Sequence, residues 1–173
     1  CRRGNKRAAQ QLLASIDNIN AVDASNNTPL MMAAQSRNVD LVRVLLDNGA
    51  DVAGHSDDKR TALHSAAWPR NNVDVLRLLV ERGADVNAKN MRGEQPIDLV
   101  DDVANFRCLL EAGADLERAL VAAATKQLVD IVDELIDCGV DVDARGGRSD
   151  WTALMNAAGN VHDDGEVVLL LLV

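Results

Sequence analysis

One short sequence pattern recurs along the chain and restricts the possible folds more than any other feature. Residues 28–34 read TPLMMAA, and the pattern returns 33 residues later, from 28 to 61, as TALHSAA. It returns again from Thr152, with weaker copies from Gln95 and Arg118. A second pattern keeps the same phase: a Leu-Leu or Leu-Ile pair precedes Gly49, Gly83, Gly113 and Gly139. Such repetition indicates stacked supersecondary units.

Local physical chemistry predicts the structure of each unit. Thr28 and Thr61 can cap a helix N-terminus, and Pro29 suits the first helical position because its missing N–H is not needed there. Apolar residues between 39 and 46 predict a second helix with a broad buried face. Gly49 stands where a left-handed C-terminal cap is required. Each unit should be a helix, a turn, an antiparallel helix and a loop.

Composition agrees with a thin, stacked architecture and excludes several classes of protein. The aromatic residues are Trp68, Phe106 and Trp151, so the helices must pack through Ala, Leu and Val. The net charge of −9 argues against binding to nucleic-acid phosphates. The longest apolar run, 167–173, is much shorter than the ~20 residues of a membrane span. We expect neither a nucleic-acid partner nor membrane insertion.

The three cysteines, Cys1, Cys108 and Cys138, are odd in number and widely spaced. They support neither a disulfide framework nor a zinc site, and favour a reducing, cytoplasmic location. The chain starts without Met or an apolar signal region, so we expect a fragment or a processed form. A secreted effector would meet the same conditions in a host-cell cytoplasm.

The motifs resemble those of the ankyrin repeat family. Residues 61–67 (TALHSAA) and 83–88 (GADVNA) follow the family strings T-P-L-H-x-A-A and G-A-D-V-N-A nearly letter for letter. The resemblance covers essentially the whole chain and implies an all-α ankyrin-repeat solenoid: stacked helix-turn-helix units with projecting β-hairpin loops. We expect a single domain, 1–173, of six repeats at 1–22, 23–55, 56–89, 90–117, 118–146 and 147–173, the first and last incomplete.

One region departs from the family pattern. Gly113 precedes the threonine position, occupied by Arg118, by 5 residues, whereas Gly83 precedes Gln95 by 12. One projecting hairpin is therefore predicted to be missing. Asp101 stands where an interface alanine is expected, and the turn between the helices is short. We expect the segment from 91 to 117 to be the weak point of the stack.

The sequence contains no recognisable catalytic or cofactor motif, and we expect no enzyme activity and no cofactor. Cys108 lies on an apolar stripe and is predicted to be a buried thiol, whereas Cys138 should be partly exposed. The family resemblance implies that His64 bonds neighbouring loops. Two polar clusters could offer metal ligands but are interpreted as solvated loops: His55 with Asp57 and Asp58, and His162 with Asp163 and Asp164.

Asn87 supports a hypothesis of a different kind. With Leu79 eight residues before it and Asp85 two before it, this asparagine resembles the substrate of an asparaginyl hydroxylase in ankyrin-like proteins. The alternative, which we favour, is that the Asn87 amide stabilises its loop through hydrogen bonds.

Stacked units create a concave face from hairpin tips and first helices, and solenoids use such faces for binding. Exposed Trp and Arg are enriched at interface hot spots. Trp151 is expected to contact a partner, whereas Trp68 could do so or pack locally. Mapping the repeat phase onto the face predicts these partner-binding residues: Asn27, Gln35, His55, Asp57, Asp58, Arg60, Trp68, Arg70, Lys89, Met91, Arg92, Glu94, Arg148, Trp151 and Asn156.

The sequence therefore predicts a monomeric protein-interaction module that binds another protein through its concave face and has no intrinsic catalysis. The alternative is the recognition arm of a larger enzyme, channel or secreted effector whose functional domain lies elsewhere. Acidic side chains of the second helices should form a solvated back.

Overall fold

A computed structural model of the chain describes residues 18–146, 150–159 and 165–172. Within these ranges the helices form successive pairs: α2 (Pro29–Gln35) with α3 (Val39–Asp47), α4 (Ala62–Ala67) with α5 (Val73–Glu81), the 3₁₀-helix η1 (Pro96–Leu99) with α6 (Val103–Glu111), α7 (Leu116–Thr125) with α8 (Val129–Asp137), and α9 (Ala153–Ala158) with α10 (Glu166–Leu170). The strands β1 (Arg145–Gly146) and β2 (Trp151–Thr152) pair antiparallel.

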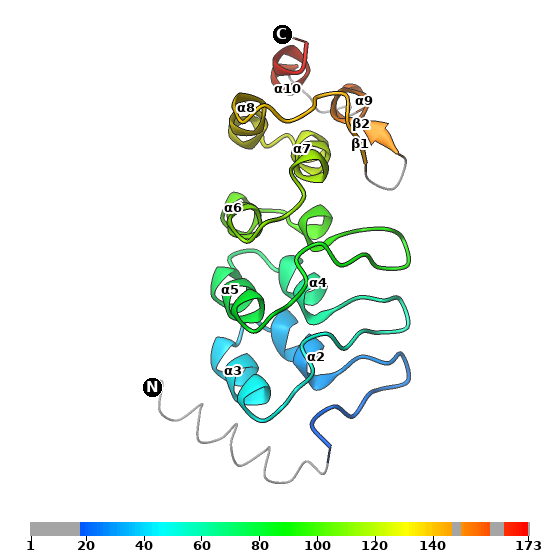
Figure 1. The fold of residues 1–173 in the computed structure, drawn as a ribbon, viewed down its shortest axis with the longest axis vertical. Helices are drawn as coiled ribbons and strands as arrows, with labels where there is room; N and C mark the ends of the chain where they lie inside the picture. The colour runs from blue at the N-terminus through cyan, green and yellow to red at the C-terminus, as the bar shows by residue number, and fades with distance from the viewer. Residues whose placement is uncertain (1–17, 147–149, 160–164, 173) are drawn as a thin grey trace.

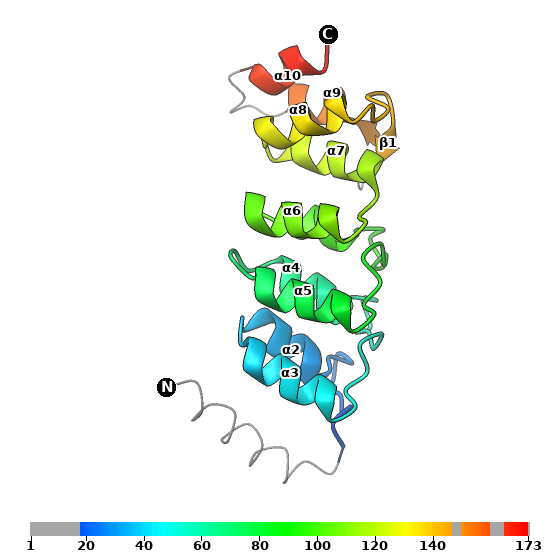
Figure 2. The same ribbon diagram turned by 60° about the vertical axis from the view of Figure 1, so that its left-hand side comes forward.

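The first helices of the pairs stack in one column, and α3, α5, α6 and α8 stack in a second column (Figure 1). Loops project from the side of the first column. Figure 2, turned by 60° from Figure 1, shows each pair as one layer of the stack. This is the predicted solenoid. None of the described helices is both long and apolar enough to cross a membrane. The predicted repeat boundaries stay a prediction, and residues 1–17 of the incomplete first repeat lie outside the described residues.

The helix ends form as local chemistry predicts. Thr28 Oγ1 accepts a hydrogen bond from Met31 N at 3.3 Å, and Pro29 occupies the first turn of α2. Gly49 has a φ of +88° at the end of α3, a conformation that costs a residue without Cβ little. Ala50 N then donates to Leu45 O at 3.0 Å, which satisfies a carbonyl of the last helical turn.

The core of the described residues lies between the two columns and consists mostly of leucine, valine and alanine, with Ile97, Ile131 and Phe106 as larger members. The paired alanines Ala33–Ala34 and Ala66–Ala67 are buried and lie at the contact of α2 with α4. Leu63, Leu79 and Phe106 are completely inaccessible to solvent. Small side chains allow the first helices to approach closely, as the composition predicts.

Two buried asparagine amides bind the turns between helices of successive pairs. Asn72 Nδ2 donates to Ala34 O at 3.0 Å and to Ala66 O at 2.8 Å. Asn105 occupies the corresponding position one unit later: its Oδ1 accepts from Asn72 N at 2.9 Å, and its Nδ2 donates to Pro69 O at 2.8 Å. The amides therefore connect α2, α4 and α6 at the end opposite the hairpin loops.

Successive hairpin loops are joined to each other through the backbone. Each tip closes on itself, as in the 2.9 Å bond from Asn90 N to Glu94 O. Asp57 N donates to Ser25 O at 3.1 Å, and Met91 N donates to Asp58 O at 2.8 Å. These bonds connect three loops into a short ladder, which agrees with the predicted projecting hairpins.

The predicted irregular region is visible in the third described pair. In the place of a first α-helix it has η1, a single 3₁₀ turn, after which Val100 is extended. The hairpin expected after Gly113 is missing, as predicted. Helix α7 starts before the threonine position that Arg118 occupies: Asp115 caps α7 by accepting a bond from Arg118 N at 3.1 Å, so the helix starts at Leu116.

Candidate functional site

The first helices and hairpin loops form one face of the stack, which we call the first-helix face. Two grooves lie on it and share the side chains of Trp68 and Leu99. The α2 groove has a volume of about 280 Å³ and is lined by Asn27, Met31, Met32, Gln35, Arg60, His64, Ser65, Trp68 and Leu99. The α7 groove has a volume of about 370 Å³ and is lined by Trp68, Glu94, Asp98, Leu99, Asp101, Arg118, Val121, Ala122, Thr125, Lys126 and Asn156.

Trp68 stands at the junction of the two grooves. It is the C-terminal cap residue of α4, and 63% of its surface is exposed. Local packing therefore leaves most of Trp68 exposed, and its contact with a partner stays a prediction. The predicted residues Asn27, Gln35 and Arg60 line the α2 groove with it, and Asn156 lines the α7 groove.

Other predicted residues gather at the hairpin tips. The tip side chains His55, Asp57, Asp58, Lys89, Met91 and Arg92 are exposed. Met91 is 68% exposed, the highest value among the large exposed hydrophobic residues of the described ranges. The ladder of backbone bonds brings the successive tips side by side.

Three predicted residues lie apart from the grooves or outside the described ranges. Arg70 lies in the turn between α4 and α5, where its carbonyl accepts from Arg37 Nη1 at 3.3 Å. Trp151 lies in β2 and is 46% exposed, and its indole lies beside Gly159: a Cβ there would be 3.7 Å from the ring. Arg148 lies outside the described residues.

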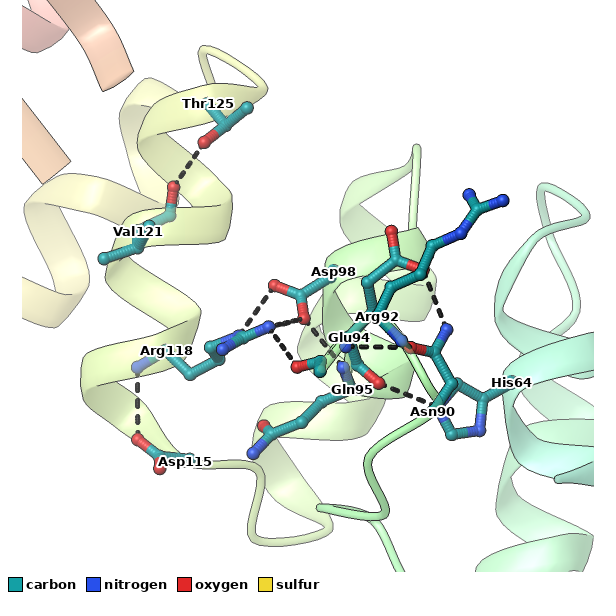
Figure 3. A network of polar contacts seen from close by, with 11 residues as sticks. His64, Asn90, Arg92, Glu94, Gln95, Asp98, Asp115, Arg118, Val121 and Thr125 are labelled. Carbon is teal, nitrogen blue, oxygen red and sulfur yellow. Dashed lines mark hydrogen bonds and ion pairs between the residues drawn. The ribbon is translucent and has the colours of Figure 1, made fainter. Parts of the chain in front are cut away.

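The expectation that Glu94 presents its side chain to a partner is wrong, because only 4% of Glu94 is exposed. Asn90 Nδ2 donates to Glu94 Oε2 at 2.7 Å, and Glu94 N donates to Asn90 Oδ1 at 3.0 Å (Figure 3). These bonds hold the carboxylate back inside its own hairpin loop. Glu94 therefore forms part of the wall of the α7 groove rather than a projecting contact.

His64 links α4 to the following hairpin loop. Its Nε2 lies 3.0 Å from Glu94 O, to which it donates, and its Nδ1 accepts from Thr61 N at 3.1 Å. Burial lowers the pKa of His64, and this effect outweighs the opposing effect of the Glu94 carbonyl. The imidazole is thus held neutral in a structural role, as the family resemblance implies.

An ion pair that the sequence analysis missed crosses the α7 groove. Arg118 Nε donates to Asp98 Oδ1 and Oδ2 at 3.0 and 2.9 Å, and Arg118 Nη2 donates to Oδ2 at 2.6 Å (Figure 3). The side chains are 12% and 14% exposed. Arg118 Nη2 also donates to Gly93 O at 2.7 Å, and Asp98 accepts from Gln95 N at 2.7 Å. Arg118 thereby attaches α7 to η1 and to the last loop of the ladder.

A second, more exposed pair lies at the other end of the α7 groove. Lys126 Nζ is 3.3 Å from Asp101 Oδ1, and the Asp101 side chain is 61% exposed. Asp101 thus faces solvent where an alanine was expected. Most of the groove-lining residues that the sequence did not predict lie in η1 and α7. Asp98 and Arg118 could have indicated them, because they are charged residues at positions where the repeat pattern has other residue types.

The remaining candidate reactive groups are the cysteines and the side chains that could bind a metal. Burial raises the pKa of the Cys108 thiol, which is 4% exposed, so it stays protonated at neutral pH. Cys138 is exposed, as predicted. Among the described residues no group of three His, Cys, Asp or Glu side chains could hold a metal ion. His162, Asp163 and Asp164 lie outside them.

Asn87 is bonded through both ends of its amide. Nδ2 donates to Gly113 O at 3.1 Å, and Oδ1 accepts from Asp115 N at 3.0 Å. Asn20 makes the corresponding bonds to Gly49 and Asp51. The favoured loop-stabilising role of Asn87 therefore has its hydrogen bonds in the structure, and hydroxylation of Asn87 stays a prediction.

The second helices carry the acidic back. Exposed carboxylates of this column include Asp47, Asp74, Glu81, Asp130, Asp133, Glu134 and Asp137. Some are paired between successive helix pairs: Arg82 with Asp47 at 2.7 Å, and Arg107 with Glu134 at 3.1 Å. The back is a solvated surface with scattered arginine bridges.

The chain is similar in sequence and fold to known proteins. The profile of ankyrin repeats (3 copies) matches residues 1–90. Protein lin-12 of Caenorhabditis elegans is 40% identical over 63 residues, which make up 36% of this chain and 4% of that protein. The human ASB11 ankyrin repeat domain matches with a TM-score of 0.80 and 26% identity, over 98% of this chain and 79% of that one. Ankyrin repeats are generally protein–protein interaction modules, and this chain belongs to the ankyrin repeat family.

Proposed function

We propose that the chain is a protein-interaction module that binds a partner protein through its first-helix face and has no catalysis of its own. The observation that carries the proposal is the exposed Trp68 at the junction of two grooves. An exposed indole beside apolar and charged groove walls has the chemistry of an interface hot spot. Met91 and Arg92 extend the same surface along the loop tips.

The proposal is tested by comparing partner capture by two sets of variants. Trp68, Met91 and Arg92 are replaced by alanine in one chain. In the matched control the exposed back residues Asp74, Asp133 and Asp137 are replaced instead. Circular dichroism first establishes that both chains fold. We expect the first variant to lose most proteins captured from cell lysate by the wild type, and the control to keep them. Equal capture by the two variants would show that the first-helix face is not the binding surface.

A second candidate is the recognition arm of a larger enzyme, channel or secreted effector. The alignment with lin-12, of which it covers only 4%, favours it, because there a matching segment is part of a far longer protein. A transcript that joins this segment to a catalytic or membrane domain would support the second candidate. A transcript that encodes ankyrin repeats alone would exclude it.

We also infer a reducing, cytoplasmic environment. Cys108 and Cys138 are both free thiols in the structure, and disulfides are uncommon in reducing compartments. Imaging of the tagged protein in its own cells tests the inference: signal outside the cytoplasm would contradict it.

A further inference from the structure

We propose that the α2 groove binds an acidic side chain of the partner protein, with its carboxylate paired to the Arg60 guanidinium. The inference rests on the proposed function and names the chemistry that one part of the first-helix face recognises. It is argued from the lining of the groove, from the charge that the fold leaves there and from the state of the carboxylates around it.

The α2 groove is lined by equivalent positions of two successive units, together with Leu99 of η1. The pairs, 33 residues apart, are Asn27 with Arg60, Met31 with His64, Met32 with Ser65, and Gln35 with Trp68. The volume of about 280 Å³ is close to the lower end of the ~300–1,000 Å³ of small-molecule sites. The space therefore suits one side chain of a docked protein.

The charge in the α2 groove is positive. Among the described residues that line it, Arg60 carries the one charged side chain, and none of them is a carboxylate. His64 contributes no charge at neutral pH, because burial lowers its pKa and the Arg60 charge lowers it further. Electrostatic complementarity therefore selects an anionic occupant.

The fold supplies no acceptor for the Arg60 guanidinium within the described part of the chain. Arg60 Nε is buried without a hydrogen-bond partner, and the ion pairs of the described residues do not include Arg60. The backbone alone is engaged: Arg60 N donates to Ser56 Oγ at 3.2 Å, and Arg60 O accepts from Ser56 N at 2.9 Å. Solvent screens a half-buried cation less than an exposed one, so an incoming carboxylate would gain a charge-assisted bond.

Two carboxylates in the neighbouring loops are bound to other groups. Asp23 accepts from Asn27 N and from Asn27 Nδ2, each at 2.9 Å, and these bonds lower the pKa of Asp23. Glu94, one unit beyond Arg60, is 4% exposed and accepts from Asn90 Nδ2 at 2.7 Å. Neither carboxylate lines the α2 groove, so the place beside Arg60 is left to the partner.

The other groove walls add neutral donors and apolar surface. Gln35 and Ser65 form no side-chain hydrogen bond with the rest of the described chain, so an amide and a hydroxyl are available to donate to an anion. Met32 and Trp68 are 59% and 63% exposed and offer apolar contact to a residue beside the acidic one. The α2 groove thus fits an acidic residue that has an apolar neighbour in the partner.

The probes are acetylated and amidated alanine-based peptides of equal length, with one leucine beside a central glutamate, glutamine, lysine or phosphoserine. Glutamine keeps the shape of glutamate without its charge. Binding is followed by Trp68 fluorescence in a Trp151→Phe chain. We expect saturable binding of the glutamate peptide at or below ~1 mM, binding of the glutamine peptide weaker by about tenfold, and none of lysine. Equal binding of glutamate and glutamine, or no saturable binding of glutamate, would overturn the proposal. Phosphoserine bound more than about tenfold tighter than glutamate would replace it by a phosphopeptide site.

Variants locate the binding, with fluorescein-labelled peptides measured by polarisation. Arg60→Gln should weaken binding of the glutamate peptide by about tenfold, and Arg60→Glu should shift the preference to the lysine peptide. Arg43→Gln, exposed on α3, is the matched control, because it changes the net charge as Arg60→Gln does; its affinity should stay unchanged. Circular dichroism establishes that each variant folds. Equal effects of Arg60→Gln and Arg43→Gln, or a preference for glutamate that persists in Arg60→Glu, would overturn the proposal.

The two proposals fail separately. Loss of partner capture in the Trp68, Met91 and Arg92 variant, together with no preference for the glutamate peptide, would leave the interaction module standing and remove the site for an acidic side chain. Unchanged partner capture in that variant would remove the first-helix face itself.

Discussion

The region from α2 to α5 and the region from η1 to α7 join their neighbours in different ways. In the first region, α2 and α4 pack directly through paired alanines, and the hairpin loops are bonded tip to tip. In the second, η1 is one 3₁₀ turn and the next hairpin is missing, so Arg118 bonds Asp98 and Gly93 O instead. Side-chain bonds of Arg118 thus join the elements here, where backbone bonds between hairpin loops join them in the first region.

The difference shows which parts of the stack can change. The second-helix column keeps its length through the irregular region, with 9 residues in each of α3, α5, α6 and α8. Asn72 and Asn105 keep the turns in register there. The second-helix column and its turns stay regular here, whereas the first-helix column is shorter at η1 and has a groove there. The α7 groove thus lies where the packing of the stack is least regular.

The largest effect should follow the removal of Arg118, because the irregular region depends on it. Arg118→Ala leaves the 14% exposed Asp98 carboxylate without its cation, and we expect a loss of about 3 kcal/mol in unfolding free energy. Urea unfolding followed by circular dichroism measures it. Hydrogen exchange should rise in residues 93–99 and 115–118 and stay unchanged in α2 and α3.

The double variant Arg118→Ala with Asp98→Ala is its control. Because no unpaired buried charge remains, the double variant should recover part of the lost stability. A double variant as unstable as the sum of the two single ones would mean that the two side chains act independently, against the interpretation of the pair as a bridge.

The regular region should respond to Asn72→Ala with a smaller loss. The change removes the donors of Ala34 O and Ala66 O, and we expect a cost of about 2 kcal/mol. Arg70→Ala, two residues away and exposed, is the matched control and should change the unfolding free energy by less than ~0.5 kcal/mol. Similar unfolding midpoints for the two variants would show that the turn amides do not hold the columns together.

His64 makes the contact between α4 and the last ladder loop sensitive to pH. Burial lowers the pKa of His64 below 6.5, so the unfolded chain takes up a proton more readily than the folded one. The stabilising contribution is complete above about pH 7.5 and is lost as the pH falls through 6.5 towards the folded pKa, by at most ~1.4 kcal/mol per pH unit.

The control is His64→Met, which places there the residue that Met31 provides in the previous unit. Its unfolding free energy should vary less with pH than that of the wild type between about pH 7.5 and pH 5. If the unfolding free energies of wild type and variant changed with pH in parallel, His64 would have the same pKa in the folded and the unfolded chain.

Much of the fold could be predicted because the repeat places the same residue types at the same positions of several helix pairs. The glycine spacing predicted even the missing hairpin. The start of α7 could not be predicted from the motif, since Asp115 both ends the Gly-Ala-Asp pattern and caps the next helix. The 3₁₀ character of η1 depends on Val100 turning extended, with φ −76° and ψ 136°, which no repeat position specifies.

The candidate site was predictable in position but less so in orientation. The repeat phase placed Trp68 and Met91 on an exposed face, because phase determines which residues occupy a helix end or a loop tip. It gave the wrong orientation for Glu94, whose carboxylate turns inward to Asn90, four residues before it. The ion pair of Arg118 and Asp98 joins residues 20 positions apart, and such a pair forms only once η1 and α7 pack together.

The smallest effect should come from the bridges of the second-helix column, which persist across both regions. Arg77 Nη2 lies 3.3 Å from Glu111 Oε2, but the side chains are 60% and 67% exposed. Solvent screens such a pair, so Arg77→Ala should change the unfolding free energy by less than ~0.5 kcal/mol, and even less at high salt. Urea unfolding at low and high ionic strength measures both. A loss near that of Arg118→Ala would mean that the back bridges, rather than the turn amides and the core, keep the second column in register.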